Sequence, residues 1–442
     1  MKKSLLSLCL VIILILSVVT VPAGAYAPSE FTVNAEHCML VNTDTNEVLY
    51  KKNIDEKIYP ASITKLLTAL VVCENVKDYN ETVTIDETLL NSLLGTDSSL
   101  SYVSAGEVLT IDQMLYYLLI TSGNDIALAL ANYIGGTVDG FTDMMNKTAK
   151  RLSMNSSNFV NPHGLPDNNH YTTVSDIHKL AVAAFSVDKI KEICGTSRHT
   201  IASTNKSGER LVATTNYLID RSTTYYYKYC TGGKTGYTDS AGRCIVSTAE
   251  KEGMHYLCIV MKADPDYTDD NGNSRRIEFV DTARLYEWAF NSFSYKTVID
   301  KNEYICDLPV KLSWTDEYVQ LLAGESLTVL VPNEAEKNSI EIDLDFLDGK
   351  SKDAKIEQGE LLAIANVYYA NEKIGTIELV AAKDINRSLM QYSWMLFTRS
   401  MGTIWFKLIF AVIGITLLLY WIIATVQINS INKKRRRVRR HR

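Results

Sequence analysis

Ser62 and Lys65 lie three residues apart in the stretch "YPASITKLLTAL", residues 59 to 70. Residues three apart share one face of a helix, so the lysine amine can approach the serine oxygen. Near a helix start, unpaired N–H groups and the positive dipole favour a deprotonated nucleophile and a neutral amine. Such a lysine can remove the serine proton. The alternative is that Ser62 only caps the helix and Lys65 is solvated.

A second polar pair, Ser122 and Asn124, lies in "TSGNDIA", between two strongly apolar stretches. A buried break between two helices would direct a hydroxyl and an amide into a cleft. Ser, Gly, Asn and Asp also favour ordinary turns, so a plain interhelix turn is the alternative interpretation.

A third polar group occurs in "GGKTGYTDSAGR", residues 232 to 243, where Lys234, Thr235 and Gly236 are predicted to lie on a strand. The lysine and threonine would present a cation and a hydroxyl to an anionic group. Gly236 would let another backbone or a ligand come close. The alternative is an ordinary edge strand that contains glycine.

Several predicted elements must position these residues. The Ser62 helix is apolar at Ile63, Leu66, Leu67 and Leu70, which is a helical spacing. Residues 37–53 read as a hairpin, and residues 242–263 as two strands around a turn at 251–253. Further helices are predicted over residues 110–121, 126–136, 174–186 and 275–293, and the third would be capped by Ser175 or Thr173.

Together and in this order, Ser-x-x-Lys, Ser-x-Asn and Lys-Thr-Gly resemble the signature set of penicillin-binding proteins and serine β-lactamases. The chain resembles the low-molecular-weight penicillin-binding proteins, the serine-type D-Ala-D-Ala carboxypeptidases. The segment "PHGLPDNNHYTTVSDI", residues 162–177, is also similar to that family, and the resemblance covers roughly residues 30–293. It implies an α/β (α+β) catalytic domain of the serine transpeptidase/β-lactamase type.

The resemblance also implies roles. Ser62 would be the acyl-accepting nucleophile and Lys65 its general base. Ser122 would relay protons to the leaving amine, and Asn124 would orient the substrate. In the third motif, Lys234 would supply positive potential and help proton relay, and Thr235 would bind the terminal carboxylate of the substrate. The backbone N–H groups of Ser62 and Tyr237 would form the oxyanion hole.

An arginine after the third motif often assists carboxylate binding in this family. The candidates here are Arg275 and Arg276, and Arg243 is the runner-up. Their spacing from the third motif does not decide among them.

No cofactor and no metal are expected. His163, His170, His178 and Asp167 could suggest a metal site, but there is no H-E-x-x-H and nothing in the sequence forces them together. Removal of Cys9 with a signal peptide would leave an odd number of cysteines and no CxxC pair, so neither a full disulfide framework nor a zinc ribbon is expected.

Both ends of the chain predict export and membrane attachment. Residues 1–27 have two lysines, an apolar run and small residues, which is typical of a signal peptide, with an uncleaved anchor as the alternative. Residues 408–426 are uncharged and would span about 28 Å as a helix. The basic tail "NKKRRRVRRHR" that follows predicts a cytoplasmic C-terminus and an extracellular catalytic domain.

The net charge argues against nucleic acid as a partner. The whole chain carries −6, and setting aside Lys2, Lys3 and the eight tail cations leaves −16 for residues 4 to 430. An acidic external domain is unsuited to phosphate backbones. The expected partners are therefore the membrane, peptidoglycan stem peptides ending in D-Ala-D-Ala, and β-lactams as inhibitors.

The predicted organisation has a domain boundary near residues 293–297 and a small β-sandwich beyond it. The segments are a signal peptide (1–27), a catalytic domain (28–295), a β-rich domain (296–385), a juxtamembrane segment (386–403), a transmembrane helix (404–427) and a basic tail (428–442). The expected activity is a D-Ala-D-Ala carboxypeptidase. A DD-endopeptidase is the alternative with the same site; a β-lactamase and a non-catalytic wall-binding module are further alternatives.

Overall fold

The structure is a computed structural model that describes residues 31–96 and 98–438, without side chains beyond residue 433. The predicted signal peptide lies outside the described residues, as do the last four residues of the basic tail. The chain forms two compact units that divide between Ser294 and Tyr295.

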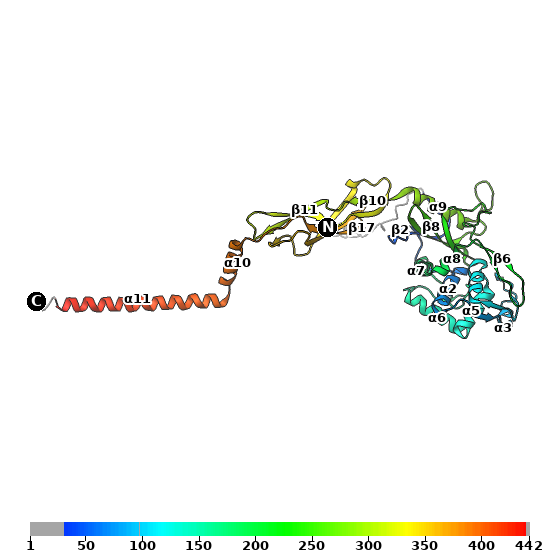
Figure 1. The fold of residues 1–442 in the computed structure, drawn as a ribbon, viewed down its shortest axis with the longest axis horizontal. Coiled ribbons are helices and arrows are strands. Elements are labelled where there is room, and N and C mark those ends of the chain that lie inside the picture. The colour runs from blue at the N-terminus through cyan, green and yellow to red at the C-terminus, as the bar shows by residue number, and fades with distance from the viewer. Residues whose placement is uncertain (1–30, 97, 439–442) are drawn as a thin grey trace, which may run out of the picture. The chain divides into compact units, whose positions relative to one another are not determined.

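The first unit is built on an antiparallel five-stranded sheet in the order β2-β1-β9-β8-β7 (Figure 1). The strands are β1 (His37–Asn42), β2 (Glu47–Lys52), β7 (Cys230–Thr238), β8 (Gly242–Lys251) and β9 (Met254–Ala263). The predicted hairpin and the predicted strand pair are confirmed. Because β7 is at the end of the order, one of its edges is left to border the site.

Helices cover both faces of this sheet. In β9, Leu257, Ile259 and Met261 join the large apolar cluster formed with the helices of the first unit, as the two-residue period of a strand requires. On the other face, Ser247 of β8 and Tyr286 of α9 (Ile277–Ser292) hydrogen bond through their hydroxyls at 2.9 Å. The helices on the cluster side include α2 (Thr64–Asn75), α4 (Ile111–Tyr116), α5 (Asn124–Gly135), α6 (Val138–Arg151), α7 (Val174–Phe185) and α8 (Asp188–Cys194).

The structure refines two of the predicted helices. Helix α7 is capped by Thr173, whose side chain accepts a hydrogen bond from Asp176 N, so the threonine and not Ser175 is the cap. The single helix predicted over 110–121 ends as α4 at Tyr116 and continues as a π-helical turn, η2 (Tyr117–Thr121). The helical segment ends at Thr121, because the residue that follows it, Ser122, turns the chain with φ +62°.

Short elements complete the first unit: the 3₁₀ turn η1 (Ala61–Ile63), helix α3 (Glu87–Asn91), and the strand pairs β3 (Thr82–Thr84) with β4 (Val108–Thr110) and β5 (Arg198–Ile201) with β6 (Arg210–Ala213).

The second unit is a β-rich domain followed by two helices. Its sheets have the orders β14-β16-β17-β12-β11-β15 and β10-β13, and both contribute to one apolar core. The strands are β10 (Phe293–Ile299), β11 (Tyr304–Lys311), β12 (Tyr318–Ala323), β13 (Leu327–Pro332), β14 (Ile340–Phe346), β15 (Lys352–Asp353), β16 (Leu361–Tyr369) and β17 (Glu372–Ala381), with a 3₁₀ turn η3 (Lys337–Ser339). The helices are α10 (Leu389–Met401) and α11 (Ile404–Val438).

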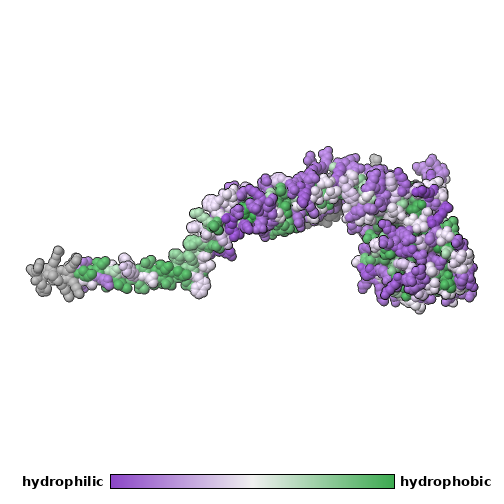
Figure 2. All heavy atoms as spheres, viewed as in Figure 1, coloured by the Kyte–Doolittle hydropathy of each residue, from purple (hydrophilic) through white to green (hydrophobic). Residues whose placement is uncertain are grey.

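Hydrophobic residues dominate the surface of α11, and Figure 2 shows this as a green stretch. Among the described residues, Ile404–Lys433 is the one helical stretch that is long and apolar enough to cross a membrane.

Candidate active site

The three polar groups singled out in the sequence meet in one cavity of about 440 Å³ in the first unit. The lining is mostly hydroxyl and backbone groups rather than apolar side chains. It consists of Ser62, Ser98, Ser99, Ser122, Thr214, Thr215, Tyr217, Thr235, Gly236, Tyr237 and Arg276. Segments up to about two hundred residues apart in the chain therefore converge here. Lys65 and Lys234, the lysines of the first and third motifs, are buried behind the lining.

The junction of η1 and α2 positions the first pair. Ser62 lies in η1, and Lys65, in the first turn of α2, is fully buried. Lys65 Nζ lies 2.9 Å from Ser62 Oγ and donates to Asn124 Oδ1 at 2.6 Å and to the carbonyl oxygen of His163 at 2.9 Å. No side chain caps either helical segment, so Ser62 Oγ is not a cap. The interpretation as a capping serine with a solvated lysine is therefore wrong.

The turn between η2 and α5 positions the second pair. Ser122 adopts the left-handed conformation, with φ +62° and ψ +36°, and α5 begins at Asn124. Left-handed backbone is costly for a residue with a side chain and concentrates at functional sites. Both side chains are buried; Asn124 Nδ2 also donates to Ser98 Oγ at 3.1 Å. Ser122 therefore lines the cavity, and Asn124 lies buried behind it, bonded to Lys65.

Strand β7 forms the opposite wall. Lys234 is buried and its Nζ donates to Ser122 Oγ at 3.0 Å and to the Thr235 carbonyl oxygen at 2.6 Å. The hydroxyl of Thr235 lies 2.6 Å from that of Thr215. At Gly236, a Cβ would stand 2.9 Å from Ser62 N, so the missing side chain lets β7 run against the start of the serine segment.

Burial and charge together set the protonation state of Lys65. Burial is the largest cause that lowers its pKa well below the usual value; the neighbouring charge of Lys234 lowers it further, and Asp125 opposes the shift. Burial also lowers the pKa of Lys234, to about 8. Within the described ranges, neither lysine forms a salt bridge with a carboxylate. The site thus places an amine with a lowered pKa beside a hydroxyl, and a second buried lysine lies on the strand opposite.

Two predicted histidines lie next to this network without forming a metal site. His170 Nδ1 accepts from Val160 N at 3.2 Å, so in the neutral ring Nε2 carries the proton toward Thr64 Oγ1 at 2.9 Å. Burial lowers the pKa of His170 to about 4 and that of His163 to about 3. Among the described residues, no three His, Cys, Asp or Glu side chains are grouped to hold a metal ion.

The three arginines that are candidates for binding the substrate carboxylate lie in different surroundings. Arg276 lines the cavity, and its guanidinium lies 5.1 Å from the Tyr217 ring and is held by the buried carboxylate of Glu278, at 2.7 Å from Nε. Arg275 is not in the lining; it is exposed and pairs with Asp269 at 2.8 Å. Arg243 lies over the Tyr237 ring at 5.1 Å.

The sequence did not single out several lining residues. Ser98, Ser99, Thr214, Thr215 and Tyr217 carry no motif, and common polar residues in loops give no signal of their own. The His163 carbonyl, which accepts from Lys65, is a backbone group and carries no side-chain signal either.

The described cysteines, seven in all, are free, and four of them are buried. This agrees with their interpretation as small hydrophobes rather than a disulfide framework.

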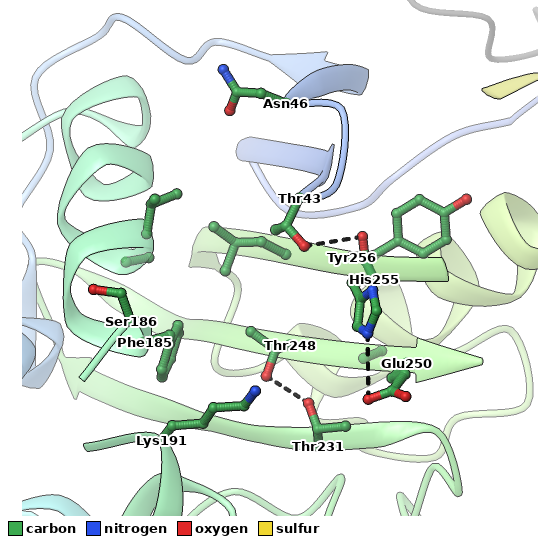
Figure 3. Close-up of a pocket in the computed structure, with 14 residues that line it drawn as sticks. Thr43, Asn46, Phe185, Ser186, Lys191, Thr231, Thr248, Glu250, His255 and Tyr256 are labelled. Carbon is green, nitrogen blue, oxygen red and sulfur yellow. Dashed lines mark hydrogen bonds and ion pairs between the residues drawn. The ribbon is translucent and has the colours of Figure 1, made fainter. Parts of the chain in front are cut away.

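A second hollow in the first unit lies between α7 and the ends of β7, β8 and β9 (Figure 3). Two pairs of its polar side chains contact each other: Thr231 with Thr248 at 2.7 Å, and His255 with Glu250 at 3.6 Å. None of the motif residues lines it. We therefore assign the chemistry to the Ser62 cavity.

A serine beside a buried lysine, a second serine, and a lysine on an edge strand define the class of serine acyl-transfer enzymes. Residues 24–265 match the D-alanyl-D-alanine carboxypeptidase family, peptidase S11, and residues 293–387 match the penicillin-binding protein 5 C-terminal domain. The chain belongs to the peptidase S11 family, and its fold is that of the penicillin-binding proteins, followed by the β domain and an apolar helix.

Similar proteins span most of the chain. D-alanyl-D-alanine carboxypeptidase DacF of Bacillus subtilis is 26% identical over 87% of this chain and 95% of its own length. A D-alanyl-D-alanine endopeptidase of Pseudomonas aeruginosa is 30% identical over 65% of this chain and 89% of its own length. The crystal structure of the carboxypeptidase DacD from Francisella tularensis has a TM-score of 0.63 at 22% identity, covering 82% of this chain and 96% of that one.

Proposed function

We propose that this chain removes the terminal D-alanine from peptidoglycan stem peptides through an acyl-enzyme on Ser62. The observation that carries the proposal is the buried Lys65 amine, 2.9 Å from Ser62 Oγ and with a lowered pKa. Neutral Lys65 takes the Ser62 proton as Oγ attacks the penultimate carbonyl carbon. The N–H groups of Ser62 and Tyr237 stabilise the oxyanion that forms.

The remaining residues complete the two half-reactions. Ser122, hydrogen bonded to Lys234, passes its proton to the departing amine of D-alanine as the C–N bond breaks, and the proton that Lys65 took from Ser62 replaces it on Ser122, so Lys65 is neutral again. Water then attacks the carbonyl carbon of the Ser62 ester. As the bond to Ser62 Oγ breaks, one proton of the water stays with the product carboxyl group and the other returns to Oγ. Asn124 holds Lys65 in place at 2.6 Å and orients the substrate. A β-lactam enters as a mimic of the substrate and leaves a slowly hydrolysed ester.

Carboxypeptidase activity is favoured over the endopeptidase alternative by the extent of the likeness. The carboxypeptidase of Bacillus subtilis aligns with 87% of this chain, whereas the endopeptidase of Pseudomonas aeruginosa aligns with 65%.

The test compares products from two substrates. The full chain is incubated with a pentapeptide ending in D-Ala-D-Ala and, separately, with a crosslinked muropeptide dimer, and free D-alanine and dimer cleavage are measured. We expect D-alanine release from the pentapeptide to be faster than cleavage of the dimer. The Ser62→Ala variant should release no measurable D-alanine. Dimer cleavage without D-alanine release would replace this proposal with the endopeptidase.

Arg276 is proposed to bind the substrate's terminal carboxylate together with Thr235. For Arg276→Ala we expect KM for the pentapeptide to rise and kcat/KM to fall roughly 30-fold, because a hydrogen bond between charged groups contributes about 2 kcal/mol. Arg275→Ala is the matched control, since Arg275 pairs with Asp269 outside the lining, and it should match wild type. Equal losses in both variants would contradict this role.

The pH dependence of kcat/KM should be bell-shaped. Lys65 accepts a proton only when it is neutral, so activity rises as pH passes the lowered pKa of Lys65. Activity falls above a pH near 8, where Lys234 loses its charge. Lys234→Arg keeps that charge, so the variant should retain activity to higher pH than wild type. An unchanged alkaline limb in this variant would assign the limb to another group.

We propose that α11 crosses the membrane with the catalytic domain outside and the basic tail in the cytoplasm. The charge-free run of residues 408–426 and the eight tail cations support this orientation. The segment boundaries of the sequence prediction, from the signal peptide at 1–27 to the tail at 428–442, are retained as part of this proposal.

A further inference from the structure

An apolar surface in the second unit is not used by the catalytic proposal. A hollow is lined by Trp314, Met390, Gln391, Ser393, Trp394 and Phe397. Trp314 follows β11 in a loop of the β domain and is 70% exposed, and Trp394 of α10 is 66% exposed. Two exposed tryptophans beside each other are unusual on a protein surface that faces only water. We call Trp314, Met390, Trp394 and Phe397 the Trp314 patch.

The patch is built partly on one face of α10. Met390, Trp394, Phe397 and Met401 follow one another at spacings of four, three and four residues, so they lie on one stripe of the helix, and all are exposed. The start of α10 is fixed to the β domain: Ser388 N donates to the Leu312 carbonyl oxygen at 2.7 Å. The helix face and the Trp314 loop are therefore held side by side.

The chain itself indicates what covers this patch. Only Gly402 and Thr403 separate α10 from α11, and the uncharged run begins at Leu408, about 6 Å along α11 from its first residue. The end of α10 must then lie at the membrane surface. A helix of 13 residues is about 20 Å long. If it lay along the surface, its apolar stripe would face the acyl chains, as in other interfacial helices.

Charge also favours a lipid surface. From residue 385 to the end, the sequence contains no Asp or Glu, while Arg387, Arg399 and Lys407 lie around α10. Cations beside an apolar stripe suit lipid phosphates above acyl chains. Tryptophan is enriched at this depth because its ring is apolar and its N–H remains hydrated.

We infer that the Trp314 patch inserts into the outer interface of the bilayer, so that the β domain itself contacts lipid and is oriented by it. The inference rests on the proposed membrane span of α11, but goes beyond it: a span alone would leave the β domain free to turn on its tether. Contact at both α10 and the Trp314 loop restricts that motion and fixes the height of the β domain's attached end.

The test uses the full chain in nanodiscs of phosphatidylethanolamine and phosphatidylglycerol. Trp314, Tyr304 and Ile415 are each replaced in turn by the photoreactive p-benzoyl-phenylalanine, and cross-links to lipid are measured by mass spectrometry after illumination. Tyr304 is the matched control, because it is an exposed aromatic at the start of β11, about 23 Å along the strand from the end that leads to Trp314. Ile415 reports on the span itself.

We expect lipid cross-links from positions 314 and 415, and at least a tenfold lower yield from position 304. Cross-links at 415 with none at 314 would overturn the inference and leave the span intact. Cross-links from 314 to another protein chain would overturn it in favour of a protein interface. Absence of lipid cross-links at 415 would overturn the span, and the inference with it, while catalysis in the product assay would be unaffected.

Discussion

Ser62→Ala is expected to abolish labelling by fluorescent penicillin and to lower D-alanine release by at least ~10⁴-fold, the scale seen when a serine nucleophile is removed. Among the described hydroxyls that line the cavity, Ser122 also lies beside a lysine, but it is hydrogen bonded to Lys234, whose pKa burial lowers to about 8. Ser62 Oγ does not cap the helix, so its loss should leave the melting temperature close to that of wild type.

The measurement is gel fluorescence after a time course with labelled penicillin, alongside thermal unfolding of both proteins. Ser186→Ala, in the hollow away from the active site, is the matched control and should label like wild type. If the Ser62 variant folds and is labelled at the wild-type rate, the nucleophile is another residue.

Lys65→Met is expected to fold and to be acylated about 10²- to 10⁴-fold more slowly, the range for loss of a general base. Methionine retains the buried aliphatic chain, which limits the cavity that alanine would leave. It cannot take the Ser62 proton, and it leaves Asn124 Oδ1 and the His163 carbonyl without their donor. Some loss of stability should therefore accompany the loss of rate.

Acylation rates are measured with penicillin by stopped flow over a range of pH. Lys191→Met is the matched control, because Lys191 is exposed and lines only the second hollow. The acid limb of the wild-type profile should disappear in Lys65→Met. Near-normal acylation, or an acid limb that persists in this variant, would assign proton removal to another group.

Patterns within one element were predictable, and contacts between elements were not. The two-residue alternation and turn of residues 242–263 specified β8 and β9, because a strand displays its periodicity locally. The π-helical end of the helix predicted over 110–121 had no such signal. This π-helical end leads into the turn at Ser122. The turn places the Ser122 hydroxyl 3.0 Å from the Nζ atom of Lys234, which lies more than a hundred residues later in the chain.

The sequence by itself determined which side chains could do chemistry, the family resemblance and the apolar run near the C-terminus, since these depend on residue type and order. Only the tertiary structure decided whether Lys65 is solvated or buried, and which of Arg275 and Arg276 lines the cavity. The physical reason is that burial and the approach of another charge are set by packing between distant segments. These two effects lower the pKa of Lys65, and they are the physical basis of its proposed role as the base that activates Ser62.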